Sequence, residues 1–398
     1  MSKILITGNG FDLFHHLPTK YGHFMSIMMT IEETSFSSDD ITFEELFGSF
    51  FKQKFENDYN LIIQNYDVDK IIFLKSDVEE ISDFLKKNHW FRHFKTILNL
   101  STWIDFEMEI ERVLNQFAIL FNESNHKNSI DYRQSKLNIN ENFMAFEVFY
   151  IVQNNYIKVH DYYIDLRTKC IDSQKVLEHL SKSLKQFRLL FNDYIVKIVS
   201  IFYGGKKARD NSYLKKIDKF LTFNYTDTLQ EFYEIEHSNL KYIHGRINKN
   251  SEENTIVIGV ENIPEQLKHC KIFDFEKSFQ RIINGINSVF IEEPKEGKYG
   301  EKINFFYIIG HSLDKSDNNY INDVFRYLTL DQSKLSKIII FYYNTDDYTL
   351  KLRNLYSYFS KEHIEKFYRE ERLVFVTLNE KNLVHYINDI EIEDETYI

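Results

Sequence analysis

Apolar residues occur along this chain in two kinds of pattern, and each predicts a different element. Short runs rich in Val, Ile, Phe and Tyr are followed by small or polar residues and then by segments with helical spacing, which is typical of strands in an α/β protein. Such runs predict six strands and a candidate seventh, at Lys3–Thr7, Lys219–Phe223, Lys241–His244, Thr255–Ile258, Asn304–Ile309, Lys337–Tyr342 and Arg372–Thr377. Because the runs are almost continuously hydrophobic, they indicate a parallel sheet covered by helices on both faces.

The middle of the chain carries the second pattern, in which apolar residues recur every three or four positions. It has no glycine from residue 49 to 203 and no proline from residue 19 to 263, so the residues that usually form turns are missing. Helical spacing is clearest in two sets, Ile110, Val113, Leu114, Phe117 and Phe121, and Leu177, Leu180, Leu184, Phe187 and Phe191. The sequence therefore predicts a helical insert, with a loop in the polar run from Asn122 to Asn142.

Together the two patterns predict an α/β fold, namely a doubly wound, mostly parallel sheet with a large all-helical insert. Residues 1–38 and 204–398 are assigned to a Rossmann-type domain and residues 39–203 to the insert. A chain of 398 residues, 43% of them hydrophobic, can bury a core in both parts. Sheets of this class bind ligands at the carboxyl ends of their strands, so the residues after each strand are the first candidates for function.

The residues after the first predicted strand form either a turn that approaches a phosphate or a tight strand-to-helix turn with no ligand. The sequence TGNGFD supplies Gly8, Asn9 and Gly10, where the backbone can turn tightly and bring its N–H groups near a phosphate. The fingerprint of the dehydrogenases requires a third glycine, whereas position 13 is Leu13, so hydride transfer is disfavoured. Asp12 fits an acid that the dipole at a helix N-terminus favours.

Two later strands end in side chains suited to acid–base and positioning chemistry. Asn224 directly follows the strand that ends at Phe223, and Asp227 lies three residues further on. His244 and Gly245 close the next strand. Because parallel strands end at the same edge of a sheet, Asn224 and His244 are predicted to project over one place. A histidine in such a position is also common as a purely structural residue, and that interpretation competes with a catalytic one.

Glycines mark the same predicted edge of the sheet. Five of the twelve glycines follow predicted strands, namely Gly8, Gly10, Gly245, Gly259 and Gly310. The last of them begins the sequence Gly310-His311-Ser312-Leu313. Glycine allows a backbone to turn sharply and to approach a ligand closely, so this clustering indicates a ligand-binding edge.

The composition of the chain indicates in which compartment it works and which partners it does not bind. The chain has 49 basic and 60 acidic residues, a net charge of −11, which supplies no broad basic surface for nucleic acid. Its two cysteines, Cys170 and Cys270, are too few for a disulfide framework and fit a reducing compartment. The sequence has no apolar run as long as a signal peptide core or a membrane span. We therefore expect a cytoplasmic protein that binds neither membranes nor nucleic acid.

The motifs occur in an order that resembles a known family. GNGFD, LPT, FNYTDTL, IHG and GHSL follow one another as in the AbiH family of bacterial phage-defence proteins, whose sheet is similar to that of sirtuins. The resemblance covers the strand ends of roughly half the chain. It implies a sirtuin-like fold in which Gly8, Asn9 and Gly10 bind a pyrophosphate. Residues implied to contact the rest of the nucleotide are Asp12, Asn224, Asp227, His244, Gly259, Gly310, His311 and Ser312.

The resemblance also implies an activity. NAD would be the substrate, with no metal required, and loss of nicotinamide would leave an oxocarbenium-like ribose. Asn224 would position water, and His244, with an ordinary imidazole pKa of ~6.5, would act as the general base. The predicted function is an antiphage abortive-infection effector that cleaves the N-glycosidic bond of NAD. A phage-derived protein is the expected trigger, and association into a homo-oligomer stays open.

Three features depart from the patterns of these families. His16 stands where the AbiH pattern usually has glycine before Leu-Pro. Asp227 lies three residues after Asn224, whereas the nicotinamide-holding acid of sirtuins lies two residues after its asparagine. The zinc-binding thiolates that many sirtuins carry are missing, which argues against protein deacylation.

Two other functional classes compete with NAD cleavage. In an α/β-hydrolase, the sequence from Gly310 to Asp314 would form the nucleophile elbow, with Ser312 as the nucleophile. The fifth position of that motif should be glycine, whereas here it is Asp314. Acids and histidines in the right chain order follow at Asp346, Asp347, His363 and His385. A non-catalytic sensor of NAD or ADP-ribose would use the same sheet edge. Within the insert, the acids of the segment from Trp103 to Glu107 are expected on a solvated helix face rather than at the ligand.

Overall fold

The computed structural model describes residues 2–100, 105–126, 141–152, 156–205, 212–286, 291, 303–330 and 335–388. By their contacts, the residues fall into two units. The first consists of Met1–Leu17, Lys206–Arg246 and Ile286–Ile398, and the second of Pro18–Gly205 and Ile247–Gly285. Each unit therefore combines segments that lie far apart in the sequence.

The first unit is built on a six-stranded sheet in which every strand pairs in parallel. Its strands are β1 (Ser2–Thr7), β6 (Lys219–Thr222), β7 (Leu240–Tyr242), β8 (Asn304–Ile309), β9 (Lys337–Tyr342) and β10 (Leu373–Thr377), in the order β10-β9-β8-β1-β6-β7. The chain winds from β1 through β6 to β7, and then returns to the other side of β1 with β8. In doubly wound sheets of this order, ligands bind at the carboxyl ends of the strands where the winding reverses, here β1 and β8.

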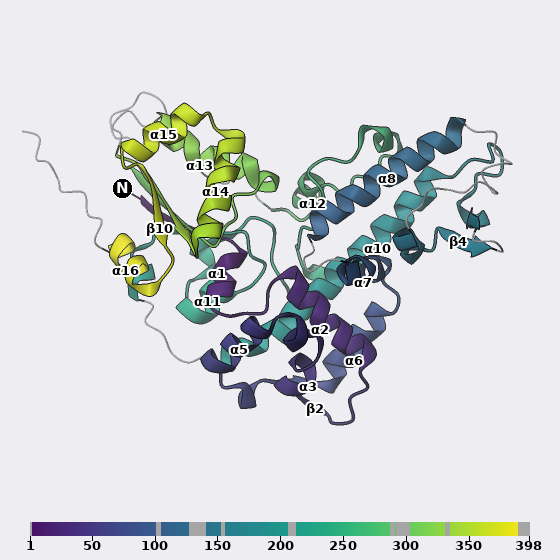
Figure 1. Cartoon of the computed structure of the whole chain (residues 1–398), viewed down its shortest axis with the longest axis horizontal. Coiled ribbons are helices and arrows are strands. Elements are labelled where there is room, and N and C mark those ends of the chain that lie inside the picture. The colour runs from purple at the N-terminus through teal and green to yellow at the C-terminus, as the bar shows by residue number, and fades with distance from the viewer. Residues whose placement is uncertain are drawn as a thin grey trace, which may run out of the picture. The chain divides into compact units, whose positions relative to one another are not determined.

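Alternate residues of the strands face two separate cores. Ile4 and Ile6 of β1 pack into one core and Leu5 into the other. Helices α13 (Asn318–Leu330), α14 (Thr345–Tyr358) and α15 (Lys361–Arg369) cover the first core, and α1 (Asn9–Phe14), α11 (Thr228–Tyr233) and α16 (Glu380–Asn388) cover the second (Figure 1). Burial on both faces explains why the strands are almost continuously hydrophobic.

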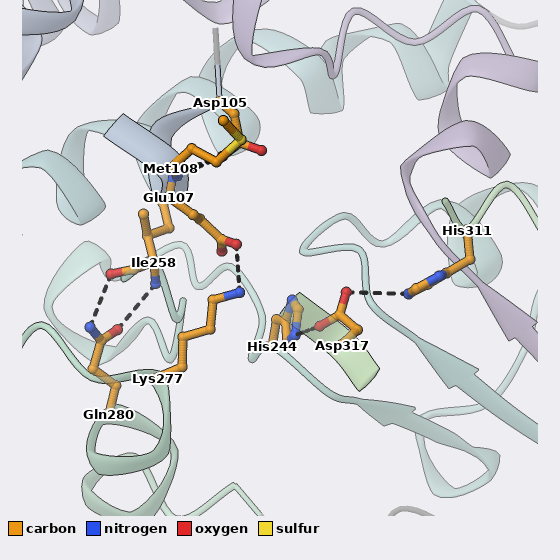
Figure 2. A network of polar contacts seen from close by, with 9 residues as sticks. All are labelled: Asp105, Glu107, Met108, His244, Ile258, Lys277, Gln280, His311 and Asp317. Atoms are coloured by element: carbon orange, nitrogen blue, oxygen red, sulfur yellow. Dashed lines mark hydrogen bonds and ion pairs between the residues drawn. The ribbon is translucent and has the colours of Figure 1, made fainter. Parts of the chain in front are cut away.

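The sheet contains all the predicted strands except one. β8 and β9 have the predicted bounds, and the others differ by one or two residues at an end. The prediction of a strand at Thr255–Ile258 is wrong, because the side chain of Gln280 takes the place of a partner strand there. Ile258 N donates to Gln280 Oε1 at 3.1 Å, and Gln280 Nε2 donates to Ile258 O at 2.9 Å (Figure 2). The polar groups of this buried backbone are thus satisfied without a sheet.

The second unit is mainly helical. Among the residues that the structure describes, its α-helices are α2 (Tyr21–Glu33), α3 (Phe43–Phe47), α4 (Phe50–Lys54), α5 (Glu56–Asn65), α6 (Lys75–Leu85), α7 (His89–Leu100), α8 (Phe106–His126), α10 (Ser173–Asp193) and α12 (Lys277–Ile283). It also contains two small antiparallel sheets, β2 (Asp40–Thr42) with β3 (Ile72–Leu74) and β4 (Phe149–Val152) with β5 (Tyr156–Val159). The prediction of an all-helical insert is therefore wrong, because runs of three or four residues are too short to show a period of two.

The helical spacing in the middle of the chain is confirmed. Both predicted apolar sets lie on α8 and α10 and are buried. The two helices lie side by side (Figure 1), with the ring of Phe106 edge-on to that of Phe187 at 5.0 Å. Residues 122–126 continue α8, so the predicted loop does not begin at Asn122, and residues 127–140 lie outside the described part of the chain. No helix among the described residues is long and apolar enough to cross a membrane.

Residues 18–38 and 247–285 group by contact with the second unit, whereas the sequence pattern groups them with the sheet. Partly buried polar contacts join the later segment to α8 and α10. Asn192 Nδ2 donates to Asn248 O at 2.9 Å, and Asn248 N donates to Asn192 Oδ1 at 2.9 Å. Lys277 on α12 lies with Nζ 2.5 Å from Glu107 Oε2 on α8. Contacts between residues so far apart in sequence leave no periodic signal. The pattern of apolar and polar residues therefore could not predict the boundaries between the two units.

Candidate functional site

The turns that follow β1 and β8 pack directly against each other. Gly10 N donates to Gly310 O at 2.8 Å, and Gly8 N donates to Ile309 O at 3.0 Å. A Cβ on Gly10 would lie 2.7 Å from the Cα of Gly310, and a Cβ on Gly8 would lie 2.8 Å from its carbonyl oxygen. Glycine is therefore required for the close approach of the two turns. Because both amides already have acceptors, they are not free to bind a phosphate.

Asp12, on α1, is a buried carboxyl group beside these turns. The residue is 1% exposed, and its Oδ2 accepts a hydrogen bond from Thr226 Oγ1 at 2.7 Å. Thr228 Oγ1 donates in turn to Thr226 Oγ1 at 3.2 Å. Burial raises the pKa of Asp12 to about 6, although hydrogen bonds from Thr226, Thr228 and Asn224 lower it. The acid thus ties the turn after β1 to the segment after β6.

Asn224 and His244 occupy equivalent positions on neighbouring strands. In the ladder between β6 and β7, Thr222 pairs with Tyr242, so Asn224 and His244 each lie two residues beyond a paired position. Asn224 N donates to Thr222 Oγ1 at 3.1 Å, which fixes the backbone at the strand end. Both residues are buried. The structure therefore brings them to one edge of the sheet.

His244 and His311 both contact Asp317, a carboxylate that the sequence analysis missed. Asp317 lies just before α13, with Oδ1 3.0 Å from His244 Nε2 and Oδ2 3.4 Å from His311 Nε2 (Figure 2). The His244 Nε2–Asp317 Oδ1 contact is close, but the two atoms are not aligned as a regular hydrogen bond. The only sequence signal for Asp317 is an acid shortly after GHSL at the start of a helix.

The charge of Asp317 is stabilised in spite of its burial. Burial raises the pKa of this carboxyl group, but its interactions with His244 and His311 outweigh burial and hold the pKa well below its ordinary value of 3.8. The ring of Phe223 packs edge-on against both imidazoles, with centroid distances of 5.2 Å to His244 and 4.3 Å to His311. A fixed negative charge and an aromatic wall therefore restrain the two histidines.

Other predicted ligand residues at this edge have partners or face solvent. Asp227 is half-buried and accepts a hydrogen bond from Tyr242 Oη at 2.6 Å, so its carboxylate is held toward β7. Ser312 is exposed, and its carbonyl oxygen accepts a hydrogen bond from Asn354 Nδ2 at 3.0 Å. Asn9 is exposed at the first residue of α1. Asn9 and Ser312 thus remain open to a ligand at the ends of β1 and β8.

Gly259 belongs to the second unit and to no strand of the sheet. A Cβ at this position would lie 2.1 Å from Phe275 O and 2.9 Å from Gln280 Nε2. Close packing against Phe275 therefore explains why the residue is glycine. The prediction that Gly259 follows a strand at the ligand edge of the sheet is wrong, since the strand before it does not form.

The acids at the start of α8 are not on a solvated helix face. Asp105 Oδ1 accepts hydrogen bonds from the backbone N–H groups of Glu107 at 2.9 Å and Met108 at 3.1 Å, which caps the helix. Glu107 Oε2 contacts Lys277 Nζ, whose side chain is 2% exposed (Figure 2). The prediction of a solvated face is wrong for Glu107, because its carboxylate contacts a lysine that lies far away in the sequence.

Two residues other than glycine adopt left-handed backbone conformations near the strand ends. His16 has a φ of 59°, and Leu313 has a φ of 57°. The left-handed region favours glycine. A glycine at position 16, as in the pattern that this sequence resembles, would adopt this conformation without strain.

The structure does not assemble a hydrolase triad around Ser312. Asp347, in the first turn of α14, accepts a hydrogen bond from the backbone N–H of Tyr343 and pairs with Lys351. His363 stacks on Phe367 within α15, and neither residue contacts the serine. Among the described residues, no hydrogen bond or ion pair joins the Ser312 side chain to an acid or a histidine. The same part of the chain holds no group of three or more side chains suited to binding a metal ion.

Comparison with known proteins identifies the family. No curated protein and no solved structure matches the chain significantly. A family model, described as bacteriophage abortive infection AbiH, matches residues 4–343, from within β1 to just beyond β9. The match includes the turn after β1, Asn224, His244 and Asp317. The chain therefore belongs to the bacteriophage abortive infection AbiH family, and this membership implies a part in antiphage abortive infection.

Proposed function

We propose that this chain is an abortive-infection effector that hydrolyses the N-glycosidic bond of NAD in a sirtuin-like site. One observation carries the proposal. Asn224 and His244 lie at matching positions at the carboxyl edge of the parallel sheet, and Asp317 places a buried carboxylate 3.0 Å behind His244. An amide and a histidine backed by a carboxylate are suited to positioning and deprotonating a nucleophile.

The proposed chemistry needs little from the protein beyond orientation and one base. Nicotinamide leaves with the electrons of the C1′–N bond, and the ribose becomes an oxocarbenium-like species. Asn224 orients the ribose and the attacking water, and His244 accepts the proton of that water. General base catalysis of this kind contributes about 10²–10⁴-fold to a rate.

The nucleotide would bind across the ends of β1 and β8, where the winding of the sheet reverses. Since the amides of Gly8 and Gly10 are already hydrogen-bonded, the exposed residues Asn9 and Ser312 are the expected contacts of the pyrophosphate and ribose. Asp12 would act from behind by orienting Asn224 and Thr226. Loss of NAD from an infected cell would stop the metabolism on which phage replication depends.

Nicotinamide release tests the proposal directly. The purified chain is incubated with NAD, with and without a phage-derived trigger, and nicotinamide is quantified. His244→Ala and Asn224→Ala should abolish release while the melting temperature and NAD affinity stay near those of the parent, since a base acts mainly in the transition state. His363→Ala, which changes an exposed histidine of the same unit, is the matched control and should behave like the parent.

The competing functions give different results in the same assay. If neither condition releases nicotinamide while ADP-ribose still binds, the chain is a nucleotide sensor. Ser312→Ala should weaken nucleotide binding by only ~0.5–1.5 kcal/mol, the net contribution of one hydrogen bond. Covalent labelling of Ser312 by a serine-reactive phosphonate would instead establish the hydrolase.

A further inference from the structure

The contacts of His311 and His244 indicate which of their ring nitrogens carry a proton. His311 Nδ1 accepts a hydrogen bond from the backbone N–H of Leu313 at 2.9 Å. A neutral imidazole that accepts at one nitrogen carries its proton on the other. His311 therefore presents Nε2–H to Asp317 Oδ2, 3.4 Å away, and His311 anchors the carboxylate.

The same reasoning applies to His244. Its Nε2 lies 3.0 Å from Asp317 Oδ1, and an ionised carboxylate is only an acceptor of hydrogen bonds. Two lone pairs at this separation would repel each other, so Nε2 of His244 carries a proton. Nδ1 is then the basic nitrogen of the neutral ring, and it makes no hydrogen bond to any residue that the structure describes.

The surroundings keep this arrangement in place. The Phe223 ring packs edge-on against both imidazoles, and Tyr320 lies with its ring 5.4 Å from Phe223 and 6.4 Å from His244. Among the residues that the structure describes, the charged or titratable groups in contact with the His244 ring are Asp317 and Tyr320. The backbone N–H of Leu313 holds the His311 ring through Nδ1.

We propose that Asp317 is a positioning residue that fixes His244 as the Nε2–H tautomer, with His311 as its anchor, so that Nδ1 is the catalytic base. The proposal rests on the proposed function and deepens it. After the C1′–N bond breaks, water forms a bond to C1′ and gives one proton to His244 Nδ1. The products are ADP-ribose, neutral nicotinamide and a His244 imidazolium, whose charge Asp317 balances.

The tautomer can be measured without any substrate. In protein labelled with ¹⁵N-histidine, the nitrogen shifts distinguish a protonated ring nitrogen from one with a free lone pair, and loss of a signal in His244→Gln assigns the residue. At about pH 8, where histidine is ordinarily neutral, the parent protein should show a protonated Nε2 and an unprotonated Nδ1. The opposite tautomer in the parent protein would overturn the proposal, whatever the behaviour of any variant.

Asp317→Asn supplies the matched perturbation. The asparagine has the same shape but can donate its amide N–H to Nε2, so His244 should shift toward the Nδ1–H tautomer. The kcat for nicotinamide release should then fall by about 10²-fold or more, with KM nearly unchanged, because the loss falls on the base. Asp314→Asn, three residues earlier in the same loop and exposed, should keep both the tautomer and the rate.

The two proposals fail in distinguishable ways. If the parent protein releases no nicotinamide but shows the Nε2–H tautomer, the proposed NAD cleavage fails and the assignment of Asp317 stands. If nicotinamide is released and Asp317→Asn, folded as judged by its circular dichroism, keeps both the tautomer and kcat, the role of Asp317 is refuted. Should Asp317→Asn not fold, the tautomer of the parent protein still decides the matter.

Discussion

Replacing Asp12 with asparagine removes an ionisable group from a site where burial opposes its charge. Asp12 is fully buried and its pKa is raised by burial to about 6, from an ordinary value of 3.8. Asparagine keeps the shape of the side chain and an acceptor for the Thr226 hydroxyl. We therefore expect Asp12→Asn to change how the stability of the protein depends on pH.

The direction in which stability changes with pH follows from the linkage between folding and protonation. A carboxyl group whose pKa is higher in the folded state contributes stability that is fully present below pH 3.8 and is lost as the pH rises through about 6. The shift of roughly two pKa units corresponds to about 3 kcal/mol. Relative to the parent protein, Asp12→Asn should therefore gain about 3 kcal/mol of unfolding free energy between about pH 4 and about pH 8.

Urea unfolding of both proteins over this pH range, followed by circular dichroism, measures the effect as a difference at each pH. Thr226→Val removes a hydrogen bond that lowers the pKa of Asp12, so the loss of stability should extend to higher pH. Asp58→Asn, compared with the parent protein from about pH 5 down to about pH 2, is the control of opposite sign. Although burial raises the Asp58 pKa, hydrogen bonds from His23 and Lys20 hold it at about 2, and its contribution is lost only as the pH falls toward that value. A difference between Asp12→Asn and the parent that stays constant with pH would refute the reasoning.

Three further changes test the packing. Gly10→Ala should cost about 1–3 kcal/mol in urea unfolding, because its Cβ would lie 2.7 Å from a backbone Cα of the neighbouring turn, whereas Gly204→Ala, with no atom within 4 Å, should change stability by less than about 0.5 kcal/mol. His16→Gly should raise the unfolding free energy by about 1 kcal/mol in thermal melts, since a φ of 59° strains histidine but not glycine. Lys277→Met should lower the unfolding free energy of the second unit by about 3 kcal/mol, because Glu107 loses this cation. Unfolding followed by tryptophan fluorescence measures this loss, and the double variant with Glu107→Leu should recover most of it.

The sequence by itself determined the elements whose burial is periodic. β8 and β9 have their predicted bounds, and the apolar sets on α8 and α10 are buried as expected. Strands buried on both faces and helices buried along one stripe leave a local signal in the order of apolar and polar residues. Because parallel strands share a carboxyl edge, the same signal was enough to predict that Asn224 and His244 lie at one edge of the sheet.

Only the tertiary structure decided which distant groups meet. Asp317 reaches His244 across 73 positions of the chain and Glu107 reaches Lys277 across 170. Neither pair leaves a pattern in the sequence. Their partners are brought together by the fold, and the residues next to them in sequence carry no trace of the contact. For the same reason Thr255–Ile258 looks like a strand but is not one. Its apolar residues are buried, yet a glutamine side chain, not a strand, satisfies the backbone at Ile258.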